Sequence, residues 1–98
     1  MAEREFRFHT AAAKEADGAL AWYAAHSPLA AAGFLSELEH AVARVREAPE
    51  RWPRIASGTR RYVFPRFPFS LVYRFTDTKV EVIAVAHHRR KPGYWASR

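Results

Sequence analysis

The stretch that decides the fold is Val80–Trp95, VEVIAVAHHRRKPGYW, in which an apolar strand runs directly into a basic and aromatic segment. Pro92-Gly93 ends regular structure inside that segment. Both faces of the strand are apolar, with Val80, Val82, Ala84 and Ala86 on one and Ile83 and Val85 on the other. This pattern is typical of a central strand that is covered on both sides. We expect a core strand that brings cationic and aromatic side chains to one edge of a small domain.

The β-rich half around this strand supplies its neighbours. Arg60–Arg66 is predicted to be a strand, at an edge because Pro65 cannot donate to a ladder, and Phe69–Phe75 is the next strand. A turn with an even number of residues at 76–79 pairs residues whose numbers sum to about 155 and puts Arg74 opposite Glu81. Arg74 then has two open interpretations, an ion pair with Glu81 or a cation on an exposed sheet face. One face would hold Leu71, Tyr73 and Phe75 with Val80, Val82, Ala84 and Ala86, and the other Ser70, Val72 and Arg74 with Glu81, Ile83, Val85 and His87.

The first half of the chain predicts one strand and two helices. Residues 3–9 alternate, with Phe6 and Phe8 on one side, and Thr10 is a suitable N-cap for a helix over residues 11–25. Ser27-Pro28 is a helix-start signal, because proline fits the first helical position, and the second helix continues to about Glu47. Its apolar stripe, from which Glu37 lies apart, is Ala31, Phe34, Leu35, Leu38, Ala41, Val42 and Val45.

Composition limits the classes of protein that are possible. Ninety-eight residues make a single domain, residues 1–98, and the absence of cysteine excludes disulfides, thiolate metal sites and a cysteine nucleophile. The N-terminal stretch MAEREFRFH lacks the apolar region of a signal peptide, and no apolar run approaches the roughly 20 residues of a membrane span. We expect a cytoplasmic protein with no membrane partner.

Charge is concentrated in the second half. Residues 1–50 hold five Lys/Arg and eight Asp/Glu, a net charge of −3, whereas residues 51–98 hold eleven Lys/Arg and two Asp/Glu, a net charge of +9. The total is the +6 of the whole chain. This asymmetry indicates a basic patch that binds an anionic partner, either nucleic acid or an acidic protein segment. A solvated basic surface without a partner is the alternative.

The sequence offers arginine, histidine and tyrosine but little other catalytic material. It has no glycine-rich phosphate loop, and His87-His88 is a poor chelate because adjacent strand residues point to opposite faces, so we expect no metal and no cofactor. Arginine, histidine and tyrosine can cleave RNA without metal, through a base, charge stabilisation and an acid. The candidates for such catalysis or for docking without chemistry are Arg61, Arg66, Arg74, His87, Arg89, Arg90 and Tyr94.

Taken together, these features resemble the RelE/ParE superfamily of toxins from type II toxin–antitoxin systems, also called plasmid stabilisation proteins. The resemblance covers nearly the whole chain. It implies an α+β fold of order β-α-α-β-β-β, a helical hairpin packed on a small antiparallel sheet. The segments that carry it are residues 21–23, 34–38, Pro49, Arg60-Arg61, the stretches 66–69 and 72–74, 82–87, Arg89-Arg90 and 92–95.

The resemblance implies two modes of action. RelE-like members are ribosome-dependent endoribonucleases that cut messenger RNA, and ParE-like members poison DNA gyrase. Under the first mode the catalytic candidates are Arg61, Arg74, His87 and Tyr94. The chain has only three lysines, Lys14, Lys79 and Lys91, so the lysine cluster of the nuclease group is missing. We therefore favour the ParE-like mode with gyrase as target, in which the seven candidates form a target-binding surface; a degenerate toxin that only binds its antitoxin is a third possibility.

The resemblance also implies a cognate antitoxin. Its C-terminal segment is expected to fold on the toxin, as a helix across the helical hairpin or a strand on the sheet edge. We expect it to contact the groove beside Trp22, Tyr23 and Phe34. A homodimer or a toxin–antitoxin hetero-oligomer is compatible with this arrangement.

Overall fold

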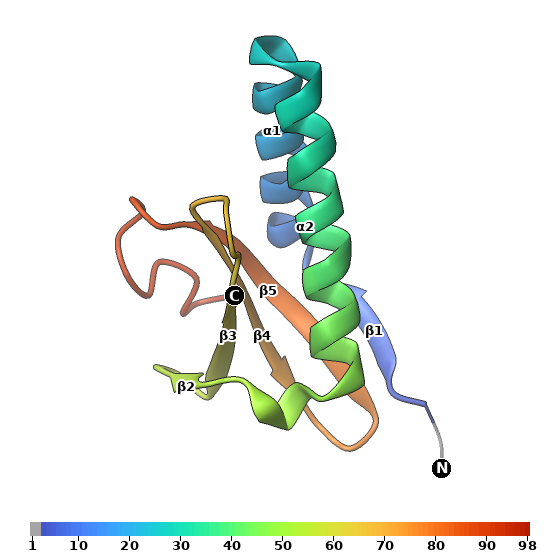
Figure 1. Cartoon of the computed structure of the whole chain (residues 1–98). Coiled ribbons are helices and arrows are strands. Elements are labelled where there is room, and N and C mark those ends of the chain that lie inside the picture. The colour runs from blue at the N-terminus through green and yellow to red at the C-terminus, as the bar shows by residue number, and fades with distance from the viewer. Residues whose placement is uncertain (1–2) are drawn as a thin grey trace.

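The computed structural model describes residues 3–98 and has two helices packed on one face of a five-stranded sheet (Figure 1). The predicted α+β fold and the helical hairpin are thereby confirmed. The hairpin extends well beyond the end of the sheet (Figure 1). In chain order the elements are β1 (Glu5–Phe8), α1 (Thr10–His26), α2 (Pro28–Glu47), a 3₁₀ turn (Pro49–Arg51), β2 (Arg54–Ile55), β3 (Thr59–Val63), β4 (Phe69–Phe75) and β5 (Lys79–His87).

The sheet has the order β1-β5-β4-β3-β2, so the stretch that opened the sequence analysis supplies its second strand, between β1 and β4. β3, β4 and β5 are antiparallel, as expected of strands joined by short turns. β1 instead runs parallel to β5, with Phe6 opposite Val80, so the prediction of a wholly antiparallel sheet was wrong in this one strand. No hairpin turn joins these two strands, because α1, α2 and three strands lie between them. β3 also ends earlier than predicted, at Val63, and is flanked by the two-residue β2.

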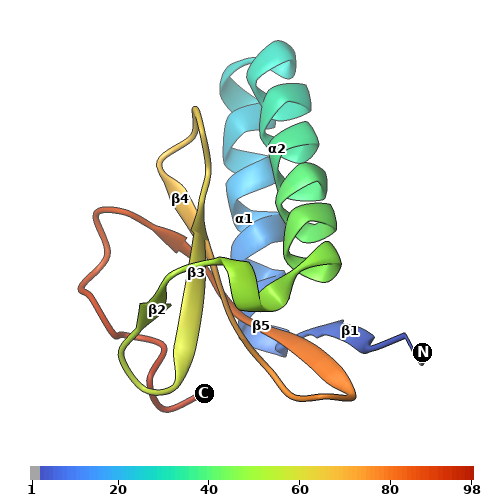
Figure 2. The ribbon, with the colours of Figure 1, turned by 60° about the horizontal axis from the view of Figure 1, so that its bottom comes forward.

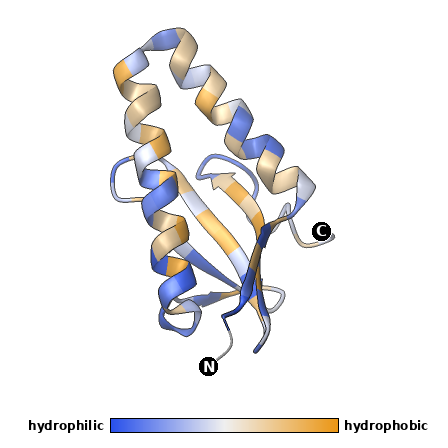
Figure 3. Ribbon diagram, turned by 90° about the vertical axis from the view of Figure 1, so that its right-hand side faces the viewer, coloured by the Kyte–Doolittle hydropathy of each residue, from blue (hydrophilic) through white to orange (hydrophobic). Residues whose placement is uncertain are grey.

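The two helices begin at identifiable caps. Ser27 caps α2 as predicted, because its Oγ accepts a hydrogen bond from the N–H of Ala30 at 3.2 Å. α1 begins one residue earlier than predicted, since its cap is His9, whose Nδ1 accepts from the N–H of Ala11 at 3.0 Å, and Thr10 is already helical. Figure 3 shows both helices banded in blue and orange, as expected of helices with one buried face. No helix within residues 3–98 is long and apolar enough to cross a membrane.

A β-bulge in the pairing of β4 with β5 changes which face the end of β5 presents. The predicted register holds for Phe75 opposite Val80 through Tyr73 opposite Val82. Val72 then pairs with Ala84, so Ile83 is an extra residue on β5. Because side chains alternate along a strand, every residue after the bulge lies on the opposite face from the one predicted. Val85 consequently joins the core under the helices, whereas Ala84 and Ala86 face away from it with Val72.

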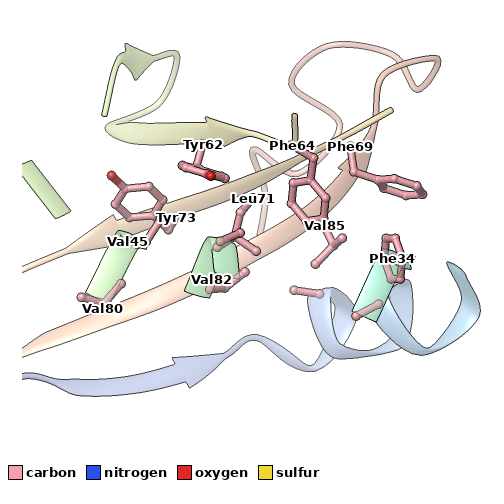
Figure 4. Packing of buried hydrophobic residues seen from close by; sticks show 13 residues of the cluster. Phe34, Val45, Tyr62, Phe64, Phe69, Leu71, Tyr73, Val80, Val82 and Val85 are labelled. Atoms are coloured by element: carbon pink, nitrogen blue, oxygen red, sulfur yellow. The ribbon is translucent and has the colours of Figure 1, made fainter. Parts of the chain in front are cut away.

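The main core lies between the helical hairpin and the sheet. Phe34 of α2 lies at one end of this core, where its ring centroid is 5.1 Å from that of Phe69 and 6.0 Å from that of Phe64 (Figure 4). At the other end of the core the hydroxyl of Tyr73 donates a 2.6 Å hydrogen bond to the carbonyl of Pro49. Burial raises the pKa of Tyr73 to about 12, so this hydroxyl keeps its proton and the bond persists at neutral pH.

Candidate functional site

An apolar groove of about 620 Å³ runs between α1 and the ends of β4 and β5. Its wall on α1 is formed by Trp22 and Tyr23, and Trp22 is 58% exposed although its ring stacks on that of His26 at 4.0 Å. An exposed tryptophan beside a groove is a typical anchor for a protein partner. The remaining residues that line the groove are Glu15, Gly18, Ala19, Pro68, Phe69, Val85, His87, Arg90 and Tyr94.

Phe34, which was predicted to contact the antitoxin together with Trp22 and Tyr23, lies beneath this surface. Its side chain is 0% exposed, because Tyr23 stacks on it at 5.5 Å and Phe67 lies 5.8 Å away. The apolar stripe of α2 predicted correctly that Phe34 is on the buried face, but it did not predict that Tyr23 stacks on Phe34. Phe34 therefore supports Tyr23 from below, and the surface at this place belongs to Trp22 and Tyr23.

His87 lies in the groove because of the β-bulge. The unbroken register predicted that His87 shares the outer sheet face with Arg74. In the structure His87 pairs with Phe69, and the two rings meet edge to face at 5.0 Å on the side of the helices. Its neighbour His88 turns the other way and lies within hydrogen-bond distance of Ser70, with Nε2 3.0 Å from the hydroxyl oxygen. The two histidines thus face different sides of the sheet, as predicted.

Glu15 of α1 is the most heavily bonded side chain of this region, and sequence reasoning missed it. Its Oε1 accepts from the N–H of Val85 at 3.1 Å and from Arg98 at 2.8 Å, and its Oε2 accepts from the hydroxyl of Tyr94 at 2.7 Å. Burial raises the pKa of Glu15, but these hydrogen bonds more than offset burial and hold the pKa below its usual range, so Glu15 is ionised at neutral pH. A signal was available, because Glu15 stands three residues after Ala12 on the buried stripe of α1.

Tyr94 is engaged by this carboxylate rather than free. Burial and the hydrogen bond to Glu15 raise the pKa of Tyr94 well above its usual range. The guanidinium of Arg90 lies 3.9 Å from the centre of its ring. A hydroxyl with a strongly raised pKa is a poor proton donor at neutral pH, and this one already donates to Glu15. Tyr94 is thus built into the structure as a contact between α1 and the segment after β5.

Arg74 forms the cross-strand ion pair that was one of its two open interpretations. Its Nη2 lies 2.9 Å from Oε1 of Glu81, the residue opposite it, and Arg7 of β1 approaches the same carboxylate at 3.4 Å. The side chain of Arg74 remains 48% exposed, whereas that of Glu81 is only 11% exposed. The ion pair therefore compensates the negative charge of a nearly buried acid, while about half of the Arg74 side chain stays exposed to solvent.

The other four candidate cations are all exposed, and two of them also contact an acid. Arg66 binds Glu37 of α2, with 2.8 Å between Nε and Oε2, although the side chain of Arg66 is 76% exposed. Arg61 projects from β3, and Arg89 and Arg90 follow β5. Arg90 also approaches Glu15 at 3.7 Å. The end of β5 thus presents exposed cations, with Glu15 beside them.

Three of the four nuclease candidates border one pocket, and the fourth does not. Arg61, His87 and Tyr94 border a pocket of about 300 Å³ to which Ser70, His88 and Trp95 also contribute. Arg74 does not line it, because it lies toward the other end of β4 against Glu81. Within residues 3–98, no three histidine or acidic side chains are grouped so as to hold a metal ion. The arrangement offers cations and two imidazoles, those of His87 and His88, for binding an anionic surface, whereas the hydroxyl of Tyr94 already donates to Glu15.

Comparisons with known proteins agree with this architecture. The family model described as "ParE toxin of type II toxin-antitoxin system, parDE" matches residues 6–92. Among solved structures, a chain described as "Chromosomal ParDE TA system from P. aeruginosa" aligns with a TM-score of 0.75 and 17% sequence identity, covering 87% of this chain and 96% of that chain. At this identity the likeness is one of fold. No curated protein matches the chain.

The arrangement of a helical hairpin on a sheet is thus shared with that solved chain. Because the family model matches most of the chain, the protein belongs to the ParE toxin family of type II toxin–antitoxin systems.

Proposed function

We propose that this toxin acts by binding DNA gyrase, in the cytoplasm, through its basic surface and without chemistry of its own. The proposal rests on the partners of two candidate catalytic residues. Arg74 is bound to Glu81 and Tyr94 is bound to Glu15, so the two do not face a common reaction centre. Exposed cations on β3 and after β5 are suited to docking on an acidic surface, namely Arg61, Arg89 and Arg90. Arg66, Arg74, His87 and Tyr94 would complete this target-binding surface from its margins.

A ribosome-dependent messenger RNA endoribonuclease is the alternative. It is favoured by one observation, the pocket that Arg61, His87 and Tyr94 share. In that case His87 would act as base and Arg61 would stabilise the phosphorane charge. This alternative is weak at two points, because the candidate acid Tyr94 has a strongly raised pKa and the candidate cation Arg74 is remote from the pocket. A degenerate toxin that retains only antitoxin binding is a third possibility.

Pulse labelling distinguishes the three possibilities. The toxin is expressed from an inducible promoter in a bacterial host, and incorporation of thymidine and methionine is followed over the first minutes. Gyrase inhibition predicts an early loss of thymidine incorporation while methionine incorporation continues. Early loss of methionine incorporation would instead establish the nuclease alternative and make Arg61, Arg74, His87 and Tyr94 the residues to substitute. Unchanged incorporation of both labels would identify a degenerate toxin.

We further propose that a cognate antitoxin occupies the groove between α1 and the end of β5. The groove combines an exposed tryptophan with apolar walls, which suits the apolar face of a peptide helix or an extended segment. Arg90 and His87 at its border favour an acidic segment. Such a complex would be a toxin–antitoxin hetero-oligomer, and pairing of two toxin chains would give a homodimer as the alternative assembly.

Trp22→Ala is expected to weaken antitoxin binding by about 2 kcal/mol, roughly 30-fold, because central aromatic anchors carry much of the energy of such interfaces. Calorimetric titration with the purified antitoxin measures this loss. Leu29→Ala is the matched control, since Leu29 is 84% exposed on α2 but does not line the groove. Equal affinity of the Trp22→Ala variant and the wild type would rule out the groove as the docking site.

A further inference from the structure

The edge of β5 is covered by a strand for only part of its length. β1 pairs with Lys79 through Val82, and the N–H of His9 then bonds to the carbonyl of Val82 before the chain enters α1. Beyond Val82, no other strand of residues 3–98 lies along this edge. An uncovered strand edge leaves backbone groups without partners and invites pairing with another chain.

Two side chains take the place of the missing strand. The carboxylate of Glu15 accepts the N–H of Val85 at 3.1 Å, and the guanidinium of Arg98 donates to the carbonyl of Ile83 at 3.0 Å. The two side chains also bind each other in bidentate geometry, at 2.8 Å and 3.0 Å. Both are well shielded, with side-chain exposures of 15% and 17%. A bidentate, shielded pair of this kind is among the stronger polar contacts in proteins.

The segment after β5 depends on this carboxylate. Its backbone hydrogen bonds from Arg89 onward are local, and Gly93 turns it back on itself with a φ of 80°. Within the described chain, every long-range hydrogen bond made by residues 89–98 ends on Glu15 or on the carbonyl of Ile83. Figure 2 shows this segment (red) on the side of the sheet away from the helices, so Glu15 reaches it around the edge of β5.

Packing alone holds this segment weakly. Tyr94 and Trp95 lie against a small cluster of Val72, Ala84 and Ala86, and no residue of the segment belongs to the main core. The Nε1 group of Trp95 is buried without a hydrogen-bond partner in the described chain, which costs free energy. The polar contacts at Glu15 therefore contribute a large share of what keeps the segment in place.

We propose that Glu15 is a positioning residue that latches residues 89–98 onto the uncovered edge of β5, and that the segment is released as a unit, without loss of the fold, when this latch is removed. The segment carries Arg89, Arg90 and Lys91. Glu15 is shielded beneath the segment and acts only by fixing where these cations lie. The effect of Glu15 on target binding therefore rests on the proposed function.

Hydrogen–deuterium exchange of the intact toxin tests the latch. Glu15→Gln keeps the size of the side chain but removes its charge, and Arg98→Ala removes the other partner. Both variants are expected to exchange amide protons in residues 89–98 about tenfold faster than the wild type, with exchange in α2 and β4 unchanged. Glu81→Gln is the matched control, because Glu81 is another shielded carboxylate with two arginine partners, and it does not contact the segment.

Unchanged exchange of residues 89–98 in both variants would overturn the latch. Equal acceleration of α2 and β4 would also overturn it, because the segment would then open only with the whole fold. Growth arrest is measured in parallel. Arrest by the wild type that falls at least tenfold in Glu15→Gln supports the positioning role, and full arrest by a variant whose segment is released overturns it. If the wild type causes no arrest, the proposed function fails while the exchange result still decides the latch.

Discussion

Replacing Phe34 with alanine is expected to lower the free energy of unfolding by about 3–5 kcal/mol, the usual range for a phenylalanine truncated in a core. The side chain is 0% exposed and is surrounded by the rings of Tyr23, Phe64, Phe67 and Phe69. Removing it leaves a cavity at the contact between α2 and the sheet. Since a domain of this size is stable by about 5–15 kcal/mol, the loss is a large fraction of the total.

Chemical denaturation followed by circular dichroism measures this effect. Leu35→Ala is the matched control, because Leu35 lies next to Phe34 on the same helix but is 40% exposed, and its loss should be clearly smaller. The Phe34→Ala variant is also expected to bind the antitoxin less well, since Tyr23 loses the ring beneath it. A change in unfolding free energy below about 1 kcal/mol would mean that Phe34 is not an essential part of the core.

Replacing Glu37 with alanine is expected to cost about 2 kcal/mol, because it leaves backbone donors without their acceptor. Oε1 of Glu37 accepts from the N–H of Arg66 at 3.1 Å and from the N–H of Phe67 at 3.3 Å, which holds the turn between β3 and β4 against α2. The ion pair itself contributes less, since the side chain of Arg66 is 76% exposed and water screens such pairs. Arg66→Ala should therefore change stability by no more than about 0.5 kcal/mol.

Thermal or chemical unfolding of the two variants separates these contributions. A larger loss for Arg66→Ala than for Glu37→Ala would show that the ion pair, and not the backbone contacts, supplies most of the stability.

The stability that Glu37 supplies should also depend on pH. Burial raises its pKa, but the hydrogen bonds from Arg66 and Phe67 outweigh burial and hold the pKa below its usual range.

The sign of the pH dependence follows from this depressed pKa. A carboxylate whose pKa is lower in the folded state supplies its stabilisation above its unfolded pKa and loses it as the pH falls through the folded pKa. The difference in stability between the wild type and Glu37→Gln should thus be largest near neutral pH and shrink below about pH 4, near the ordinary pKa of glutamate. A difference that stays constant from pH 7 to pH 3 would contradict this account.

Glu15 and Glu37 show what the apolar stripe of a helix predicts about buried residues and what it does not predict. Each stands three residues after a buried residue of its helix, Ala12 and Phe34, so each lies on the face that packs against the sheet. Glu37 was predicted to lie off the apolar stripe of α2, and no role was predicted for Glu15, because acidic side chains are usually exposed to solvent. Their partners are distant in sequence, at Arg66 and at Arg98, so nothing in either helix indicates what compensates the buried charge.

The sequence by itself determined the order of elements apart from the short β2, the helical hairpin capped at Ser27, the strands β4 and β5, and the position of Arg74 opposite Glu81. It also determined the family, because the order and spacing of many short segments are specific together. These features follow from local periodicity, capping and turn chemistry, which depend only on residues close together in the sequence.

Only the tertiary structure decided the face on which His87 lies, the parallel placement of β1, the burial of Phe34 under Tyr23 and the convergence of Tyr94 and Arg98 on Glu15. The bulge at Ile83 is the physical reason for the first of these, because one inserted residue reverses the faces of all residues after it. The others depend on contacts between residues far apart in the chain, whose energies are set by packing in three dimensions and leave no periodic signal in the sequence.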